Sequence, residues 1–272
     1  MNKSKPRYNE IIFTESQQQE ILDMYLNQKI SSVKIGQHFG CSHKPILKVL
    51  KAHNVDRTGV GRRKYNLDEF YFDTIDSHNK AYIFGFLCAD GSNCRDKATV
   101  SMALQEGDKQ ILEDIRKELK SEKELEFLDY SNKHDFGYTY QNQWRLNLFS
   151  SHICDSLNAL GMMPNKSLRF VFPKIEEVYY SDFLRGYFDG NGAIYKSGCS
   201  ITSTFDFCYY VQDILKNLGI ESLVNEASNH NGITAELRIP KKENTKKFLD
   251  YIYSDSEMHL ERKYLKYISL YC

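Results

Sequence analysis

Two apolar stretches, at positions 83–91 and 184–192, share one pattern of small and large side chains. A small residue recurs after four positions in both: Gly85 and Ala89 in the first, Gly186 and Gly190 in the second. This spacing places the small side chains on one helix face and lets a second helix approach closely. Each stretch ends in a polar residue followed by a glycine, which is typical of a helix end. The pattern predicts two helices packed side by side, with Asp90 and Asn191 together at their C-terminal ends.

The carboxylate of Asp90 requires a partner at this position. A helix C-terminus carries partial negative charge, so an acidic side chain there is unfavourable by itself. A divalent cation would compensate both the carboxylate and the helix end.

The chain after residue 66 repeats one order of elements in two halves, 67–174 and 175–272. Apolar and polar residues alternate over 98–104, which predicts a strand with one solvated face. In the first half we expect strands at 98–104, 125–130, 136–141 and 144–149 and helices at 108–119 and 150–160. In the second we expect strands at 193–196, 199–205, 223–227 and 233–239, a turn at 229–232, and helices at 207–218 and up to 253. The predicted fold class is α/β (α+β): two αββαββα halves whose antiparallel sheets form a saddle with helices behind.

The first 57 residues predict a separate all-α domain. Helices are expected at 17–26, from Ser31 or Ser32 to Phe39, and from Ser42 to His53, with a tight turn at Gly40-Cys41. Two short helices joined by a glycine turn form a helix-turn-helix pattern. Its expected core is Val33, Ile35, Phe39, Ile46, Leu47 and Leu50. Its expected DNA-facing residues are His43, Lys44, Lys48 and Lys51, placed where a recognition helix meets the major groove. A helical adaptor with a solvated basic face is the alternative.

Residues 58–66 contain two glycines and the successive basic residues Arg62, Arg63 and Lys64. We interpret them as a flexible linker that follows a DNA backbone or minor groove. A basic linker without any partner is the alternative.

Charge is distributed unevenly along a chain that is neutral as a whole. The 272 residues contain 36 Lys or Arg and 36 Asp or Glu, but residues 1–66 hold twelve of the basic and five of the acidic ones, a net charge of +7. No apolar run approaches the length of a membrane span, and no apolar signal region follows the basic start, so we expect a cytoplasmic protein without membrane contact. Seven cysteines without a C-x-x-C pair favour neither a disulfide framework nor a zinc ribbon.

The paired apolar stretches resemble the LAGLIDADG motif, whose nine positions map onto Ile83–Gly91 and Leu184–Gly192. The resemblance covers about residues 67–272. It implies a single-chain, two-motif homing endonuclease that acts as a monomer on double-stranded DNA with Mg²⁺ or another divalent cation.

The same resemblance implies roles for particular residues. The last acid of each motif is the family's metal ligand, and Asp90 matches it whereas Asn191 does not. An amide oxygen can contact a metal but brings no negative charge. The second of the two expected active sites therefore lacks the carboxylate of the family. Natural loss of activity, a one-strand nicking enzyme and an engineered Asp-to-Asn substitution all remain open. Lys166 and Lys263 resemble the family's lysine positions, where a cation stabilises developing charge or positions water.

Short hydrogen-bonding side chains and arginines on the solvated strand faces are suited to base edges and phosphates. They are Thr99, Ser101, Arg145 and Asn147 in one half, and Ser200, Thr202, Thr204, Glu236 and Arg238 in the other. Any single one could be an ordinary solvent-facing residue. We therefore expect a metal-dependent, site-specific DNA endonuclease, with a non-cleaving DNA-binding regulator or an intron-splicing maturase as the alternative. A structural protein whose two helices only pack together would leave Asp90 without a purpose.

Overall fold

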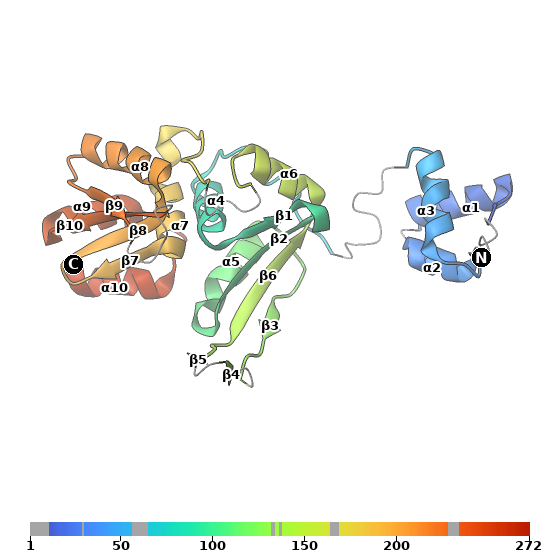
Figure 1. The fold of residues 1–272 in the computed structure, drawn as a ribbon, viewed down its shortest axis with the longest axis horizontal. Helices are drawn as coiled ribbons and strands as arrows, with labels where there is room; N and C mark the ends of the chain where they lie inside the picture. The colour runs from blue at the N-terminus through green and yellow to red at the C-terminus, as the bar shows by residue number, and fades with distance from the viewer. Residues whose placement is uncertain are drawn as a thin grey trace, which may run out of the picture. The chain divides into compact units, whose positions relative to one another are not determined.

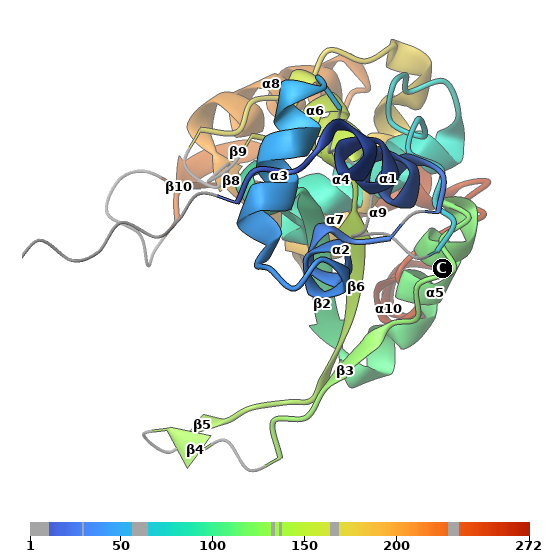
Figure 2. The same ribbon diagram turned by 90° about the vertical axis from the view of Figure 1, so that its right-hand side faces the viewer.

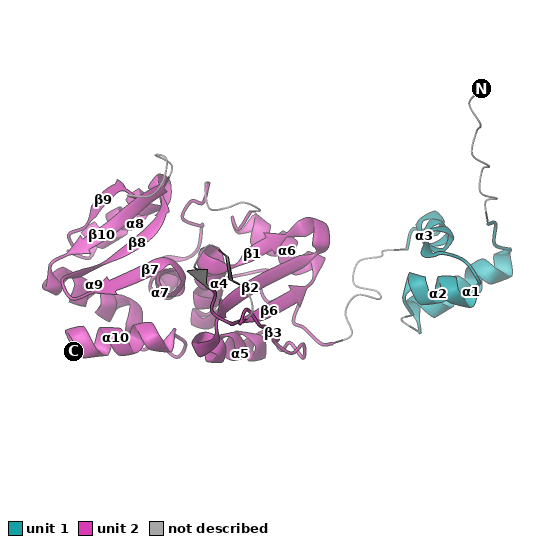
Figure 3. Ribbon diagram, turned by 60° about the horizontal axis from the view of Figure 1, so that its bottom comes forward, with its two compact units in different colours: residues 1–64 teal, residues 65–272 magenta. Residues whose placement is uncertain are grey.

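The protein divides into two units, Met1–Lys64 and Tyr65–Cys272 (Figures 1 and 3). The computed structural model describes residues 11–28, 30–55, 65–131, 134–135, 138–163, 169–227 and 234–272. Within these residues no helix is both long enough and apolar enough to cross a membrane.

Unit 1 contains the three expected helices, α1 (Glu15–Leu26), α2 (Ser32–His38) and α3 (His43–Ala52). Helix α1 begins earlier than predicted because Thr14 and Gln17 form a capping box, in which each side chain accepts a hydrogen bond from the backbone N–H of the other. Ser31 caps α2 through the backbone N–H of Lys34.

The core of unit 1 differs in part from the expectation. Its buried side chains are Phe13, Ile21, Leu22, Tyr25, Ile35, Ile46, Val49 and Leu50. The expectation that Val33 is buried is wrong, because this side chain lies on the outer face of α2 and is 52% exposed. Gly36 permits the sharp α2–α3 turn, since a Cβ atom there would lie 2.8 Å from the carbonyl oxygen of Cys41. Gly40, in the turn, adopts a positive φ of 65° that favours glycine.

Unit 2 consists of two halves that share the order helix, two strands, helix, two strands, helix, as predicted; the first half adds a short hairpin and the second adds a last helix. The first comprises α4 (His78–Asp90), β1 (Ser92–Cys94), β2 (Thr99–Gln105), α5 (Lys109–Glu118), β3 (Glu126–Leu128), β4 (His134–Asp135), β5 (Tyr138–Thr139), β6 (Gln143–Phe149) and α6 (Ser151–Ala159). The second comprises α7 (Tyr180–Asn191), β7 (Gly192–Tyr195), β8 (Gly198–Thr204), α8 (Phe205–Asn217), β9 (Leu223–Glu226), β10 (Thr234–Pro240), α9 (Lys242–Tyr253) and α10 (Glu261–Tyr271).

Each half forms one antiparallel four-stranded sheet, in the order β1-β2-β6-β3 and β7-β8-β10-β9. Helices α5 and α6 cover one face of the first sheet, and α8 and α9 cover one face of the second (Figure 1). Strand β2 alternates as expected: Val100, Met102 and Leu104 are buried against the helices, whereas Thr99 and Ser101 are half-buried on the other face. The mixed α/β class and the two-half architecture are therefore confirmed.

The two halves meet through α4 and α7, which pack side by side at the centre of unit 2 (Figure 1). Gly85 of α4 lies directly on the carbonyl group of Phe183, and Gly186 of α7 lies directly on the carbonyl group of Tyr82. Backbones can approach this closely only where no Cβ atom intervenes. The small-residue spacing thus has the predicted effect.

Three elements differ from the prediction. Strand β1 was not predicted, and it pairs with β2 at one edge of the first sheet. The strand expected at 136–141 does not join the main sheet; β5 pairs instead with β4 in a short hairpin that extends from its end (Figure 2). Helix α10 was not predicted at all. The turn expected at 229–232 lies outside the described residues.

Candidate active site at the paired helix ends

Asp90 and Asn191 are the last residues of α4 and α7, and a glycine follows each helix as expected. Asp90 is exposed, whereas Asn191 is half-buried. A Cβ atom placed on Gly190 would lie 3.3 Å from Oδ2 of Asp90, so the carboxylate of one helix borders the last turn of the other. The close helix packing therefore brings the two motif ends together.

Asn191 is oriented by a neighbouring tyrosine. Its Nδ2 donates a hydrogen bond of 3.4 Å to the hydroxyl of Tyr187, which itself lies 2.7 Å from Oγ of Ser203. Since the amide nitrogen has this contact, the amide oxygen is the atom that could approach a cation. Asn191 lines a cavity of about 210 Å³, together with Cys88, Ala89, Phe170, Tyr187, Thr202, Ser203 and Thr234.

Lys263 lies within α10 and reaches the end of α7. Its side chain is buried, and its Nζ donates to the carbonyl oxygens of Phe188 at 2.6 Å and Gly192 at 2.5 Å. These carbonyls belong to the C-terminal end of α7, where a cation is favourable. Burial lowers the pKa of Lys263 to about 8, although the negative charges of Asp189 and Asp90 oppose this shift. The other predicted lysine, Lys166, lies outside the described residues.

Asp189, in α7, is buried and contacts residues of α4 and α9 and the residue before α10. Its carboxylate accepts hydrogen bonds from the hydroxyls of Tyr82 at 2.9 Å and Tyr253 at 2.6 Å, and from the backbone N–H of Leu260 at 2.7 Å. The pKa of Asp189 is raised because the carboxylate is buried, and the three hydrogen-bond donors offset part of this rise. Because all its contacts lie inside the fold, Asp189 does not replace Asn191 at the helix ends, and instead holds the start of α10 and hence Lys263.

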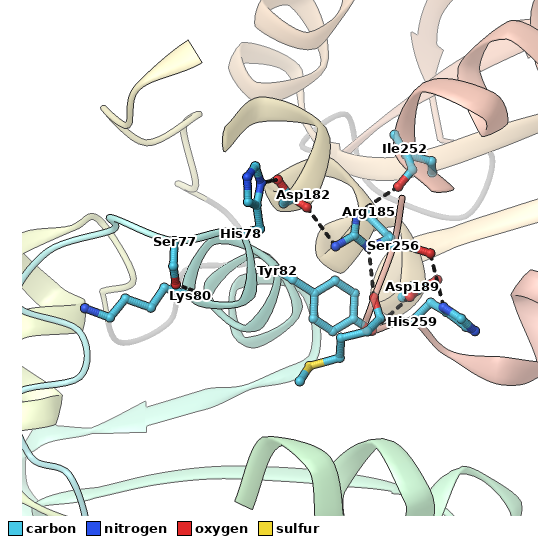
Figure 4. A network of polar contacts seen from close by, with 11 residues as sticks. Ser77, His78, Lys80, Tyr82, Asp182, Arg185, Asp189, Ile252, Ser256 and His259 are labelled. Atoms are coloured by element: carbon cyan, nitrogen blue, oxygen red, sulfur yellow. Dashed lines mark hydrogen bonds and ion pairs between the residues drawn. The ribbon is translucent and has the colours of Figure 1, made fainter. Parts of the chain in front are cut away.

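A second buried network lies nearer the N-terminal end of α7. Arg185 donates to Oδ1 of Asp182 at 2.8 Å and to the carbonyl oxygens of Met258 and Ile252 at 2.9 and 3.0 Å. The other carboxylate oxygen of Asp182 lies 2.7 Å from Nδ1 of His78, at the start of α4 (Figure 4). Sequence reasoning missed this network; the signal was an Asp and an Arg three residues apart on one predicted helix.

The solvated face of the first sheet agrees with the expectation. Thr99, Ser101, Arg145 and Asn147 are all half-buried on the face opposite the helices. Ser101 lies directly opposite Asn147 in the β2–β6 pairing.

The second sheet agrees only in part. Thr202 is half-buried and Arg238 is exposed. The expectation that Thr204 faces solvent is wrong, because its hydroxyl caps α8 through the backbone N–H of Phe207 and is hydrogen-bonded to the carbonyl oxygen of Phe170. Ser200 is also buried, in the strand position between Ala193 and Arg238.

The basic residues predicted in α3, namely His43, Lys44, Lys48 and Lys51, are all exposed. The basic residues predicted in the linker, Arg62, Arg63 and Lys64, lie outside the described residues.

The donor atoms at the helix ends limit which metal could bind. In the described part of the chain no three His, Cys, Asp or Glu side chains are grouped so that they could hold a metal ion. Of the two motif-end residues, only Asp90 has a carboxylate. Mg²⁺ takes one or two carboxylates and completes its shell with waters and substrate phosphate oxygens. The residues present therefore fit a cation that a bound phosphate helps to hold.

Comparison with known proteins finds one family model that matches part of the second half. Residues 179–253 match the family model of the LAGLIDADG-like domain. No curated protein matches the sequence.

Among solved structures, the chain is similar to full-length DUF199/WhiA from Thermatoga maritima, with a TM-score of 0.45 and 17% identity over 74% of this chain and 65% of that one. The matched part is thus slightly less than two thirds of the WhiA chain. The chain is also similar to I-DmoI in complex with DNA and Ca, with a TM-score of 0.47 and 15% identity over 74% of this chain and 99% of that one. A third similar structure is the LAGLIDADG homing endonuclease I-LtrWI bound to target DNA, with a TM-score of 0.44 and 12% identity over 74% and 89% of the two chains.

Proposed function

We propose that the chain is a site-specific, metal-dependent DNA endonuclease of homing type that nicks one strand, a proposal that starts from the match of residues 179–253 to the LAGLIDADG-like domain model. The observation that carries the proposal is the position of Asp90, an exposed carboxylate at the end of α4 that borders the last turn of α7. Asn191, at the equivalent end of α7, brings no second charge.

Asp90, with the amide oxygen of Asn191 as a weaker ligand, would hold the divalent cation. When bound, the cation supplies Lewis-acid polarisation of the scissile phosphate and a more acidic water. Lys263 holds its ammonium group at the end of α7, where it attracts phosphate and offsets the negative helix end. Asp189 fixes the start of α10 and thereby the position of that ammonium group.

Double-stranded DNA would lie along the solvated faces of the two sheets, with α3 of unit 1 adding contacts. Unit 1 and the linker carry the excess positive charge of the chain, +7 over residues 1–66, so they would supply much of the attraction to phosphates. Because both motif helices lie in one chain and pair with each other, we expect one protein molecule per DNA site.

A strand-nicking assay tests this function. The protein first selects its binding site from randomised duplex DNA. A supercoiled plasmid that carries this site should become nicked in Mg²⁺ or Mn²⁺, and Asp90→Asn should abolish the nicking. Asp213→Asn is the matched control, because Asp213 is also exposed and lies in the second half of α8, whereas it is the first turn of α8 that packs on Tyr187 through Phe207. Asn191→Asp should add double-strand cleavage.

A non-cleaving DNA-binding regulator or splicing maturase is the second candidate, and Asn191 is the observation that favours it. In that case the protein would bind its site, the plasmid would stay supercoiled, and Asn191→Asp would produce no cleavage.

A further inference from the structure

Each sheet carries one arginine in contact with a glutamate on its solvated face. In the first, Nη1 of Arg145 lies 3.9 Å from Oε2 of Glu126, and Nδ2 of Asn147 donates to the same oxygen at 3.0 Å. Glu126 lies directly opposite Arg145 in the β3–β6 pairing. One carboxylate therefore contacts two candidate DNA-reading side chains.

The second sheet repeats this combination within a single strand. Nη2 of Arg238 lies 3.3 Å from Oε2 of Glu236, two positions earlier on the same face of β10. The Arg238 side chain is 58% exposed. Strand β10 lies between β8 and β9, and Thr202 of β8 lies directly opposite Glu236. This ion pair is therefore on an inner strand of the sheet.

Neither ion pair is buried: the side chains of Arg145 and Glu126 are 37% and 51% exposed, and those of Arg238 and Glu236 are 58% and 22% exposed. Solvent-exposed ion pairs contribute little to folding stability, because water screens them and two long side chains must be ordered. The charges of each pair are therefore available for exchange with a partner that offers both an acceptor and a donor.

A G·C base pair offers that combination in the major groove. Guanine presents the acceptors N7 and O6, for which arginine is the usual partner, and cytosine presents an N4 amino group that a carboxylate accepts from. We propose that Glu126 and Glu236 are specificity-determining residues, which with Arg145 and Arg238 read one G·C pair in each half of the DNA site. This inference rests on the proposed binding of double-stranded DNA.

The main effect of the two glutamates is to lower the affinity for DNA that lacks the G·C pair. When the arginine turns to a base or phosphate, the carboxylate loses its cation, and only a base amino group replaces it. At a wrong base pair the carboxylate faces acceptor atoms or phosphates, which repel it. The glutamates should therefore lower affinity for random DNA as well as select the target.

The strand register predicts that the two G·C positions are not placed symmetrically. Arg145 lies opposite Ala103, the fifth residue of β2, whereas Arg238 lies opposite Ser200, the third residue of β8. A shift of two strand residues corresponds to about 7 Å along the sheet. The two guanine contacts should accordingly be offset from a palindrome by roughly two base-pair steps of about 3.4 Å.

Selection from randomised duplex DNA with the full-length protein in EDTA tests the inference. The protein should enrich one G·C position in each half-site. Glu236→Gln should relax one of these positions and Glu126→Gln the other, with a roughly tenfold loss of discrimination at that position, while binding of random DNA becomes tighter. Glu226→Gln is the control: it removes the same charge from the same sheet, but Glu226 lies opposite the buried Ala235, on the other face.

The outcomes separate the inference from the function on which it rests. An enriched site whose base preferences are the same for the protein and both glutamine variants would overturn the inference and leave DNA binding intact. A selection that enriches no sequence at all would overturn both. Equal melting temperatures of the variants exclude misfolding as the cause of any change.

Discussion

Gly186 of α7 lies directly against the carbonyl group of Tyr82 in α4, and Gly85 of α4 makes the reciprocal contact with Phe183. The two helices therefore touch through backbone atoms over the turns that precede Asp90 and Asn191. The positions of the helix ends, and with them the candidate site, depend on this contact.

Gly186→Ala should destabilise unit 2 strongly. The added Cβ atom would meet backbone atoms, which cannot rotate away as a side chain can, so the helices must separate. We expect a loss of about 3 kcal/mol or more in the free energy of unfolding, measured by chemical denaturation. Gly107→Ala is the control, because a Cβ atom at Gly107 meets no atom within 4 Å. A Gly186→Ala protein as stable as this control would contradict the packing of α4 on α7.

Lys263 should make stability rise with pH above 8. Burial lowers the pKa of Lys263 to about 8 in the folded protein, whereas an unfolded lysine titrates near 10.4. Between these values the unfolded chain binds more protons, so the free energy of unfolding rises with pH, by at most about 1.4 kcal/mol per pH unit. Below pH 8 both states hold the proton and the slope from this group vanishes.

The measurement is the difference in unfolding free energy between the protein and Lys263→Met at pH 7.5, 8.5 and 9.5. This difference should shift in favour of the lysine protein as the pH rises. Tyrosine ionisation affects both proteins alike and therefore cancels in the difference. Lys266→Met, which changes an exposed lysine on the same helix, should show no such shift. A constant difference for Lys263→Met would show that its ammonium group is not desolvated.

The sequence predicted most of the fold because its signals are local. The glycine after each motif helix and the alternation in β2 depend on a few neighbouring residues. Thr204 shows the limit of this reasoning. Alternation along β8 places it on the solvated face, but it is also the residue before α8, and there the N-cap role decides its contacts.

The site itself was only partly predictable. Asp90 and Asn191 could be found because they end a repeated pattern. The contacts of Lys263, and the contact of Asp189 with Leu260, depend on α10, which packs against α9 and β7. Its aromatic residues Tyr264, Tyr267 and Tyr271 have helical spacing, a signal that would have revealed the helix but not what Lys263 touches.

The exposed lysines of α3 should account for part of the salt dependence of DNA binding. Replacing Lys44, Lys48 and Lys51 together by glutamine should weaken binding and reduce the slope of log K against log salt by about 2–3, since each phosphate contact contributes about 0.9. Lys34→Gln, on the neighbouring helix α2 and also exposed, serves as the single-charge control. Binding isotherms at several salt concentrations measure the slope. An unchanged slope in the triple variant would remove unit 1 from the DNA interface.

Asn191→Asp should make stability depend on divalent metal. The substitution places a second carboxylate at the end of α7, next to the exposed carboxylate of Asp90 and at the negative end of the helix dipole. Two like charges so placed repel one another unless a cation lies between them. Without metal we expect the free energy of unfolding to fall by about 1 kcal/mol, and with Mg²⁺ we expect a recovery that grows with its concentration, as ligand binding to the folded state requires.

Asn217→Asp is the matched control, because Asn217 is the exposed last residue of α8 and acquires the same charge at the end of a different helix. Thermal denaturation of both variants with EDTA and with Mg²⁺ measures the effect. If Mg²⁺ raised the melting temperatures of the two variants equally, the paired helix ends would not form a metal site, and Asp90 would have no metal-dependent role.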